Sequence, residues 1–276
     1  MLNKLKPIQY ENPGKAFISG ASSGLGASFA QQLAFCGFDL VLLARREERL
    51  KAIASQLESE YSIQCEILLV DLSNPKEIED VAKHISQMDN LDVLVNCAGF
   101  ATLGKFIDVP INKSMGMFHV HMTAPVYFTH AALQNMQKRK RGIVINVSSM
   151  GALSLTPGNV VYDSTKSFLN TFSENITLEI DNPEIKIQAL CPGFTSSEFH
   201  SVGDFVSYDK SAIPNSFWMT PDEVVSLSLD ALKKSRKIIF VPGWKNKLFL
   251  WFVQYIPPFR KAIQNSIKKR DSKYLT

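Results

Sequence analysis

Short apolar segments alternate with longer amphipathic segments along the whole of this 276-residue chain. The short segments are apolar almost throughout, which is typical of parallel β-strands that helices cover on both faces. We expect strands at residues 15–19, 39–44, 64–70, 92–96, 142–147, 186–191 and 237–241. The segments between them have helical periodicity, for example residues 25–35, 46–61 and 75–88. This alternation requires right-handed crossovers and predicts an α/β fold: one domain with a doubly wound, Rossmann-type parallel sheet.

Composition excludes several classes of protein. The chain is 45% apolar and 20% charged, as an ordinary globular protein is. The apolar run at residues 248–253 is far shorter than the ~20 residues of a transmembrane helix, and residues 1–15 lack the apolar core of a signal peptide. The four cysteines form no metal-ligand cluster, so we expect no metal site and a reducing, cytoplasmic location.

Charge is distributed unevenly between the body and the C-terminal tail. Residues 245–276 carry eight Lys and Arg against one Asp, a net charge of +7, which leaves −3 for residues 1–244. A body of that charge is not expected to bind nucleic acid. The tail is aromatic and apolar up to residue 259 and basic and amphipathic beyond it. Three uses remain open for it: contact with an anionic membrane surface, cover for a substrate entrance, or pairing with another subunit.

The expected domain boundaries follow from these patterns. Residues 1–14 are an N-terminal extension, residues 15–244 a catalytic domain, and residues 245–276 the basic tail. Within the domain, capping signals begin two helices, Ser73-Asn74-Pro75 and the capping-box spacing of Thr220 and Glu223.

A glycine-rich turn follows the first expected strand and leads directly into a helix. It reads Gly20-Ala21-Ser22-Ser23-Gly24-Leu25-Gly26. Glycines permit a tight turn and a close approach to a pyrophosphate, to which the helix N-terminus presents free N–H groups and partial positive charge. A glycine turn by itself can be purely structural, but strand, turn and helix in this order favour a dinucleotide site.

The end of the second expected strand indicates which dinucleotide binds. It reads Ala44-Arg45-Arg46, where an acid would bind a ribose 2′-hydroxyl and an arginine suits a 2′-phosphate. We therefore predict that Arg45 binds NADP(H), with NAD(H) the less favoured cofactor. The alternative is that both arginines simply begin a solvated helix beside Glu47 and Glu48.

Three separate residues suggest catalysis. Tyr162 and Lys166 are spaced to share one face of a helix, where the ammonium is expected to lower the phenol pKa from about 10. Ser149 follows the fifth expected strand and can point over the carboxyl edge of the sheet, whereas Ser148 then points the other way.

Together these motifs resemble the short-chain dehydrogenase/reductase family over residues 14–244. Asp71-Leu72 resembles its adenine-binding strand end, and Asn96-Cys97-Ala98-Gly99 its NNAG motif, with Cys97 in the second position. Cys191-Pro192-Gly193-Phe194-Thr195 resembles its Pro-Gly segment. The chain is most similar to the DltE-like, 3-ketoacyl reductase and hydroxysteroid dehydrogenase branch.

The resemblance implies a role for each matching residue. Tyr162 would exchange a proton with the substrate oxygen, Lys166 would hold the nicotinamide ribose and lower the tyrosine pKa, and Ser149 would polarise the carbonyl. The expected cofactor site comprises Gly20, Ser22, Ser23, Gly24, Leu25, Gly26, Arg45, Asp71, Leu72, Asn96, Ala98, Gly99, Tyr162, Lys166, Pro192, Gly193 and Thr195.

One position departs from the family pattern. The family usually has an Asn that holds a relay water behind the lysine, and this chain has His121 there. We include His121 in the catalytic set because it can bind a water and titrates near neutrality. The alternative is a buried helix histidine satisfied by backbone. Further along, Pro125 predicts a break in the same helical stretch.

Residues 194–219 are expected to form a substrate loop. They are rich in aromatic side chains, at positions 194, 199, 205, 208, 217 and 218. Such a loop beyond the strand ends favours an apolar substrate, fatty-acyl or steroid-like, unless the aromatics only pack a subdomain. The sequence thus predicts an NADP(H)-dependent oxidoreductase for a carbonyl or secondary alcohol, and by family analogy a homo-oligomer. The alternative is a non-catalytic dinucleotide-binding scaffold or sensor.

Overall fold

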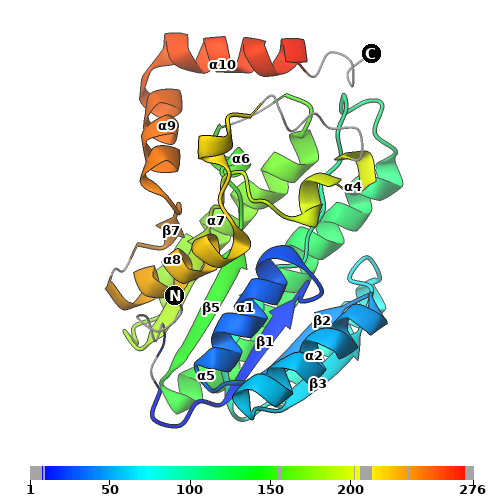
Figure 1. The fold of residues 1–276 in the computed structure, drawn as a ribbon, viewed down its shortest axis with the longest axis vertical. Helices are drawn as coiled ribbons and strands as arrows, with labels where there is room; N and C mark the ends of the chain where they lie inside the picture. The colour runs from blue at the N-terminus through cyan, green and yellow to red at the C-terminus, as the bar shows by residue number, and fades with distance from the viewer. Residues whose placement is uncertain are drawn as a thin grey trace.

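Seven parallel strands form one sheet in the order β3-β2-β1-β4-β5-β6-β7, with helices on both faces (Figure 1). The computed structural model describes residues 8, 10–154, 157–201, 203–205, 213–234 and 237–270. The strands are β1 (Lys15–Ser19), β2 (Asp39–Ala44), β3 (Cys65–Leu69), β4 (Leu91–Asn96), β5 (Gly142–Val147), β6 (Ile185–Leu190) and β7 (Ile239–Phe240). The helices are α1 (Gly24–Phe35), α2 (Glu47–Tyr61), α3 (Pro75–Ser86), α4 (Ile111–Phe118), the π-helix η2 (His119–Thr123), α5 (Ala124–Arg139), α6 (Gly151–Ser154), α7 (Val160–Glu179), the 3-10 helices η3 (Glu198–Ser201), η4 (Gly203–Phe205) and η6 (Asn215–Phe217), α8 (Pro221–Lys234), α9 (Trp244–Tyr255) and α10 (Pro257–Arg270).

The doubly wound α/β fold predicted from the sequence is confirmed, with every strand end within two residues of its expected position. Strands β1, β2, β4 and β5 are buried nearly throughout, as their continuous apolar sequence requires. Strand β3 lies at one edge of the sheet and is only partly buried. A parallel strand at the edge has a neighbour on one side only, which explains the difference.

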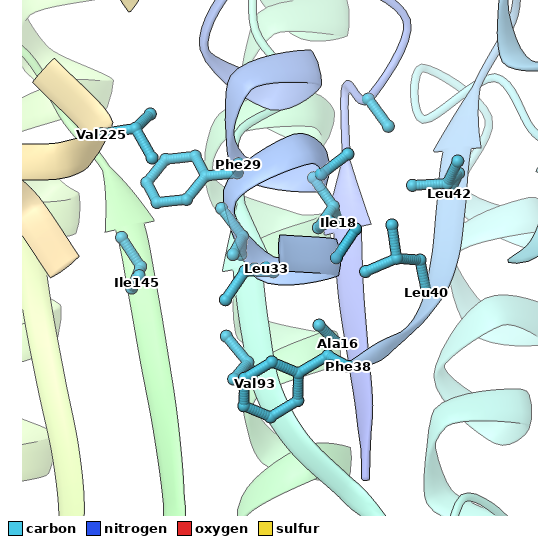
Figure 2. Packing of buried hydrophobic residues seen from close by; sticks show 14 of the residues in the cluster. Ala16, Ile18, Phe29, Leu33, Phe38, Leu40, Leu42, Val93, Ile145 and Val225 are labelled. Carbon is cyan, nitrogen blue, oxygen red and sulfur yellow. The ribbon is translucent and has the colours of Figure 1, made fainter. Parts of the chain in front are cut away.

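Two apolar cores lie on opposite faces of the sheet because side chains alternate along each strand. Ala16 and Ile18 of β1 face the core that α1, α2 and α8 cover, and Phe17 between them faces the core under α3 and α5. Phe29 of α1 and Val225 of α8 meet the strand side chains of the first core (Figure 2). Both cores fix the helices against the sheet and so fix the loops that follow each strand.

The predicted helix signals are confirmed at their own positions. The Glu223 carboxylate accepts from the Thr220 N–H at 2.8 Å, and the Thr220 hydroxyl accepts from the Glu223 N–H at 3.2 Å. The Asn74 side chain caps α3 by accepting from the Lys76 N–H. Pro125 lies in the first turn of α5, directly after the π-helix, so the predicted break is present.

Helix α9 is packed against the body of the protein, and α10 packs on α9. Asn246, Leu250 and Val253 of α9 are buried, and α10 turns across the end of α9 (Figure 1). No helix within the described part of the chain is long and apolar enough to cross a membrane. Most of the expected N-terminal extension, residues 202 and 206–212 of the expected substrate loop, and residues 271–276 of the tail lie outside the described residues.

Candidate active site

The glycine-rich turn leaves the carboxyl end of β1 at the centre of the sheet, where the strand order reverses between β1 and β4. Gly20 has a φ of +74°, and a Cβ there would come within 2.8 Å of the Ala98 Cα. A Cβ on Gly26 would come within 2.2 Å of the Gly20 carbonyl oxygen. The turn therefore needs glycine at both positions, and it lies in the crevice where open α/β sheets bind ligands.

The N-terminus of α1 has the properties of an anion site. Its N-cap residue, Ser23, makes no side-chain capping hydrogen bond, and no acidic residue occurs in its first turn. The first turns of α2, α3 and α8, by contrast, all contain Asp or Glu. Free N–H groups with no carboxylate to neutralise them suit a pyrophosphate, so the turn fits a dinucleotide.

Arg46, rather than the predicted Arg45, contacts the glycine-rich turn. Its guanidinium donates to the Ser22 hydroxyl at 2.9 and 3.1 Å and to the Ser23 hydroxyl at 2.7 Å. Arg45 is more exposed and lies 3.9 Å from the carboxylate of Asp71. Both guanidiniums are at the end of β2. Arg46 was not among the predicted cofactor residues; the signal that could have found it is the pair of serines in the turn, Ser22 and Ser23.

Three of the remaining predicted cofactor residues lie after β3 and β4. Asp71 follows β3, and hydrogen bonds from Ser73 hold its pKa below the usual range, with a smaller contribution from Arg45. Leu72 is buried in the second core, while Ala98 packs against Gly20.

Asn96 has a structural position beneath the crevice. Its side-chain amide donates to Asn146 at 2.8 Å and to Thr129 at 3.2 Å, and the residue is buried. The loop after β4 is held by a residue that the sequence analysis missed: the Ser19 hydroxyl accepts from the N–H groups of Cys97 and Ala98. These bonds explain how the loop is kept over the turn.

Ser149, Tyr162 and Lys166 come together at the carboxyl edge of β5. Ser149 follows the strand, and its hydroxyl accepts from the Gly151 N–H at 3.0 Å. The same hydroxyl lies close enough to Tyr162 to lower the pKa of the phenol. The Lys166 ammonium donates to the Val147 carbonyl at 2.7 Å and lies 5.7 Å from the centre of the Tyr162 ring. Ser148 points away and donates to the backbone of Lys166.

Burial determines the direction of the pKa shifts of Tyr162 and Lys166. It raises the pKa of Tyr162 above its ordinary value, and the nearby Ser149 hydroxyl only partly offsets this. Desolvation of the phenolate is therefore the largest effect on the tyrosine in this structure, and the lowering of its pKa by Lys166 stays a prediction for the cofactor-bound protein. Burial also lowers the pKa of Lys166, to about 8.

His121 is only 1% exposed and both of its ring nitrogens have protein partners. Nε2 accepts from the Phe100 N–H at 3.2 Å, and Nδ1 lies 2.9 Å from the Thr165 hydroxyl oxygen. That hydroxyl donates to the Tyr162 carbonyl, so it accepts from a protonated Nδ1. Burial lowers the pKa of His121 well below its usual value, and Lys166 lowers it further. This geometry favours the buried, satisfied histidine over a water-holding relay.

The Pro-Gly segment follows β6 and is hydrogen-bonded to the loop after β5. The Pro192 carbonyl accepts from the Met150 N–H at 2.9 Å. Thr195 is buried, and its hydroxyl donates to the Gly193 carbonyl. A Cβ on Gly193 would come within 2.9 Å of Asn246 in α9. The C-terminal helices are thus in contact with the segment that borders the site.

The aromatic residues of the substrate loop divide into two groups. The Phe199 ring lies 5.9 Å from the ring of Tyr162, and Phe194 packs on Trp218. Phe217 packs instead on Phe249 of α9. The predicted loop therefore both borders the tyrosine and packs against the C-terminal helices. Tyr208 lies outside the described residues.

The fold and the site together define a dinucleotide-binding α/β protein with a serine, a tyrosine and a lysine at the cofactor crevice. Comparisons with known proteins agree. The family model for the short chain dehydrogenase matches residues 15–202. This chain therefore belongs to the short-chain dehydrogenase/reductase family of oxidoreductases.

Individual relatives share 26 to 33% sequence identity with this chain. The chain is 33% identical to the NADP-dependent 3-hydroxy acid dehydrogenase of Schizosaccharomyces pombe, over 80% of this chain and 88% of that one. It is 27% identical to the inactive hydroxysteroid dehydrogenase-like protein 1 of Rattus norvegicus, over 88% of this chain and 72% of that protein. A short-chain dehydrogenase from Sphingobium yanoikuyae, solved with NADPH, superposes with a TM-score of 0.77 at 26% identity, covering 95% of this chain and 96% of that one.

Proposed function

We propose that this protein is an NADP(H)-dependent oxidoreductase that acts on a carbonyl or secondary alcohol group of an apolar substrate. The observation that carries the proposal is the convergence of the Ser149 hydroxyl, the Tyr162 phenol and the Lys166 ammonium near the loop after β4, which packs on the glycine-rich turn. The chemistry that the dinucleotide supplies when bound is hydride transfer at the nicotinamide C4. The proton and the orientation of the substrate come from the chain itself.

In the direction of carbonyl reduction, Tyr162 would act as the acid. A phenol is protonated at neutral pH, so Tyr162 can donate its proton to the substrate oxygen as the carbonyl carbon accepts hydride. The Ser149 hydroxyl is placed to hydrogen-bond the same oxygen. Lys166, with a pKa of about 8, remains mostly charged and stabilises the tyrosinate that is left. Water then reprotonates the tyrosine.

NADP(H) is the proposed cofactor because two arginines stand at the end of β2, where a 2′-phosphate would lie. Arg46 is held at the turn by Ser22 and Ser23, and Arg45 stands beside Asp71. The S. pombe relative is named NADP-dependent, and the Sphingobium neighbour was solved with NADPH, which support the same choice.

An apolar substrate is proposed from the aromatic border of the site. Phe199 stands beside the tyrosine ring and Phe194 packs with Trp218 in the same loop. A ketone or alcohol on a fatty-acyl or steroid-like frame would bury apolar surface against such side chains.

Turnover in the presence of NADPH tests the proposal. The wild type is expected to oxidise NADPH with at least one member of a panel of aldehydes and apolar ketones. Tyr162→Phe removes only the phenolic oxygen, so we expect turnover to fall at least ~100-fold while NADPH still binds. A wild type that binds NADPH but turns over no member of a broad panel would contradict the proposal.

That result would favour a non-catalytic dinucleotide-binding scaffold. The observation that favours the scaffold is that the Rattus norvegicus relative is named inactive. The presence of Ser149, Tyr162 and Lys166 together at the carboxyl edge of β5 supports the enzyme instead. We also propose a homo-oligomer, by analogy with the family, which sedimentation velocity of the purified protein tests.

A further inference from the structure

Helix α9 has apolar side chains on three sides, and the rest of the protein covers only two of them. One side, with Leu250 and Val253, is buried against the body of the protein. A second side packs on α10, where the Phe259 ring lies 5.5 Å from Phe252 and 6.1 Å from Phe249. A surface helix with these sides covered normally has a polar third side.

The third side of α9 is aromatic and exposed instead. Trp244, Leu248, Trp251 and Tyr255 are 70%, 47%, 52% and 69% exposed. Their spacing of four, three and four residues places them on one face of the helix, which we call the α9 stripe. Scattered apolar side chains are normal on a protein surface, but a continuous aromatic row of this kind marks an interaction site.

The α9 stripe is held rigidly. Arg260, at the start of α10, donates to the carbonyls of Val253 and Gln254 at 2.8 and 2.9 Å and so caps the end of α9. The corner between α9 and α10 is thereby fixed, and α9 stands at the outer edge of the molecule (Figure 1). The stripe is therefore preorganised for a flat partner.

The charged side chains of the segment that carries the stripe have one sign only. Residues 244–270 contain seven Lys and Arg and no Asp or Glu. Lys245 and Lys247 of α9 and Lys261 of α10 are exposed. The Lys245 ammonium lies 5.8 Å from the centre of the Trp244 ring, beside the stripe. A second copy of this surface would bring like charges together, which disfavours self-pairing, whereas an anionic surface is complementary.

We propose that the α9 stripe binds the surface of an anionic lipid bilayer. Trp and Tyr have an apolar body and a polar tip and prefer the bilayer interface, while lysines beside them attract anionic headgroups. No described helix can span the bilayer, so α9 lies in the interface with its stripe among the headgroups. This inference does not depend on the reaction catalysed.

Cosedimentation of the full chain with vesicles tests it. We expect binding to vesicles of phosphatidylcholine mixed with phosphatidylglycerol, weaker binding to phosphatidylcholine alone, and weakening when salt rises from about 0.1 to about 0.5 M. The double variant Trp244→Ser, Trp251→Ser is expected to lose about tenfold or more in affinity. A matched control is Ile107→Ser, Leu178→Ser, which removes two side chains that are 84% and 80% exposed elsewhere, and it should bind as the wild type does.

Three results would overturn the proposal. One is that the wild type fails to bind the anionic vesicles. The second is that the tryptophan double variant binds them unchanged. The third is that this double variant converts an oligomer to a smaller species in sedimentation velocity without lipid, because another copy of the chain then covers the stripe. NADPH binding by both double variants serves as the check that each is folded.

Discussion

Replacing His121 by asparagine tests whether this residue is a neutral buried support or a titrating relay. The imidazole is 1% exposed, accepts from the Phe100 N–H through Nε2, and lies against the Thr165 hydroxyl through Nδ1. Both contacts are made by the neutral ring, and burial holds the pKa of His121 well below its usual value. The folded protein therefore resists protonation at this site.

The magnitude follows from proton linkage. In the unfolded chain the pKa of His121 is about 6.5, so below that pH the unfolded state binds a proton that the folded state excludes. The free energy of unfolding then falls by about 1.4 kcal/mol for each pH unit below 6.5, until the folded pKa is reached. From pH 7 to pH 5 the loss attributable to His121 is at most about 2 kcal/mol, the limit set by protonation of the unfolded chain alone. Asparagine does not titrate, so this part of the pH dependence should vanish in His121→Asn.

Urea unfolding followed by tryptophan fluorescence at pH 7 and pH 5 measures the difference. The wild type should lose more stability than His121→Asn between the two pH values, by up to about 2 kcal/mol. His130→Asn, which replaces an exposed histidine, should behave as the wild type does. Equal losses in wild type and His121→Asn would refute the reasoning. We also expect the pH profile of NADPH turnover to keep its shape in His121→Asn, whereas a relay role would shift it.

Further outcomes follow from the site and the fold. Arg46→Ala should weaken NADPH binding about 10- to 100-fold with little change for NADH, by fluorescence titration; equal effects on both would remove Arg46 from the 2′-phosphate site. Gly20→Ala, with a Cβ 2.8 Å from the Ala98 Cα and a φ of +74°, should reduce NADPH binding and lower the unfolding free energy by at least about 1 kcal/mol; unchanged melting and binding would contradict this. Thr220→Ala removes one half of the capping box with Glu223 and should cost about 1 kcal/mol in urea unfolding, without affecting NADPH affinity.

Local sequence patterns predicted most of the fold, because the apolar or polar character of a residue already indicates whether that residue will be buried. The continuous apolar run of residues 142–147 and the Thr220–Glu223 spacing each require a specific local structure, and both were found. The glycines at 20 and 26 were likewise predictable, because a turn this tight excludes any Cβ.

Contacts between segments that are distant in the sequence could not be predicted from local patterns. Which of two adjacent arginines reaches the turn depends on how the end of β2 is set against β1, and Arg46 was found there. The role of Ser19 under the loop after β4 has no local signal, because it rests on the pairing of β1 with β4.

By itself the sequence determined the order of strands and helices, the parallel doubly wound sheet, the glycine cradle, and the separate serine, tyrosine and lysine. These follow from periodicity and backbone sterics, which act over a few residues. Tertiary structure decided the rest: the direction of the tyrosine pKa shift, the neutral state of His121, and the exposure of one face of α9. Each of these depends on how much water the assembled fold excludes from a group, and that is set only when distant segments pack together.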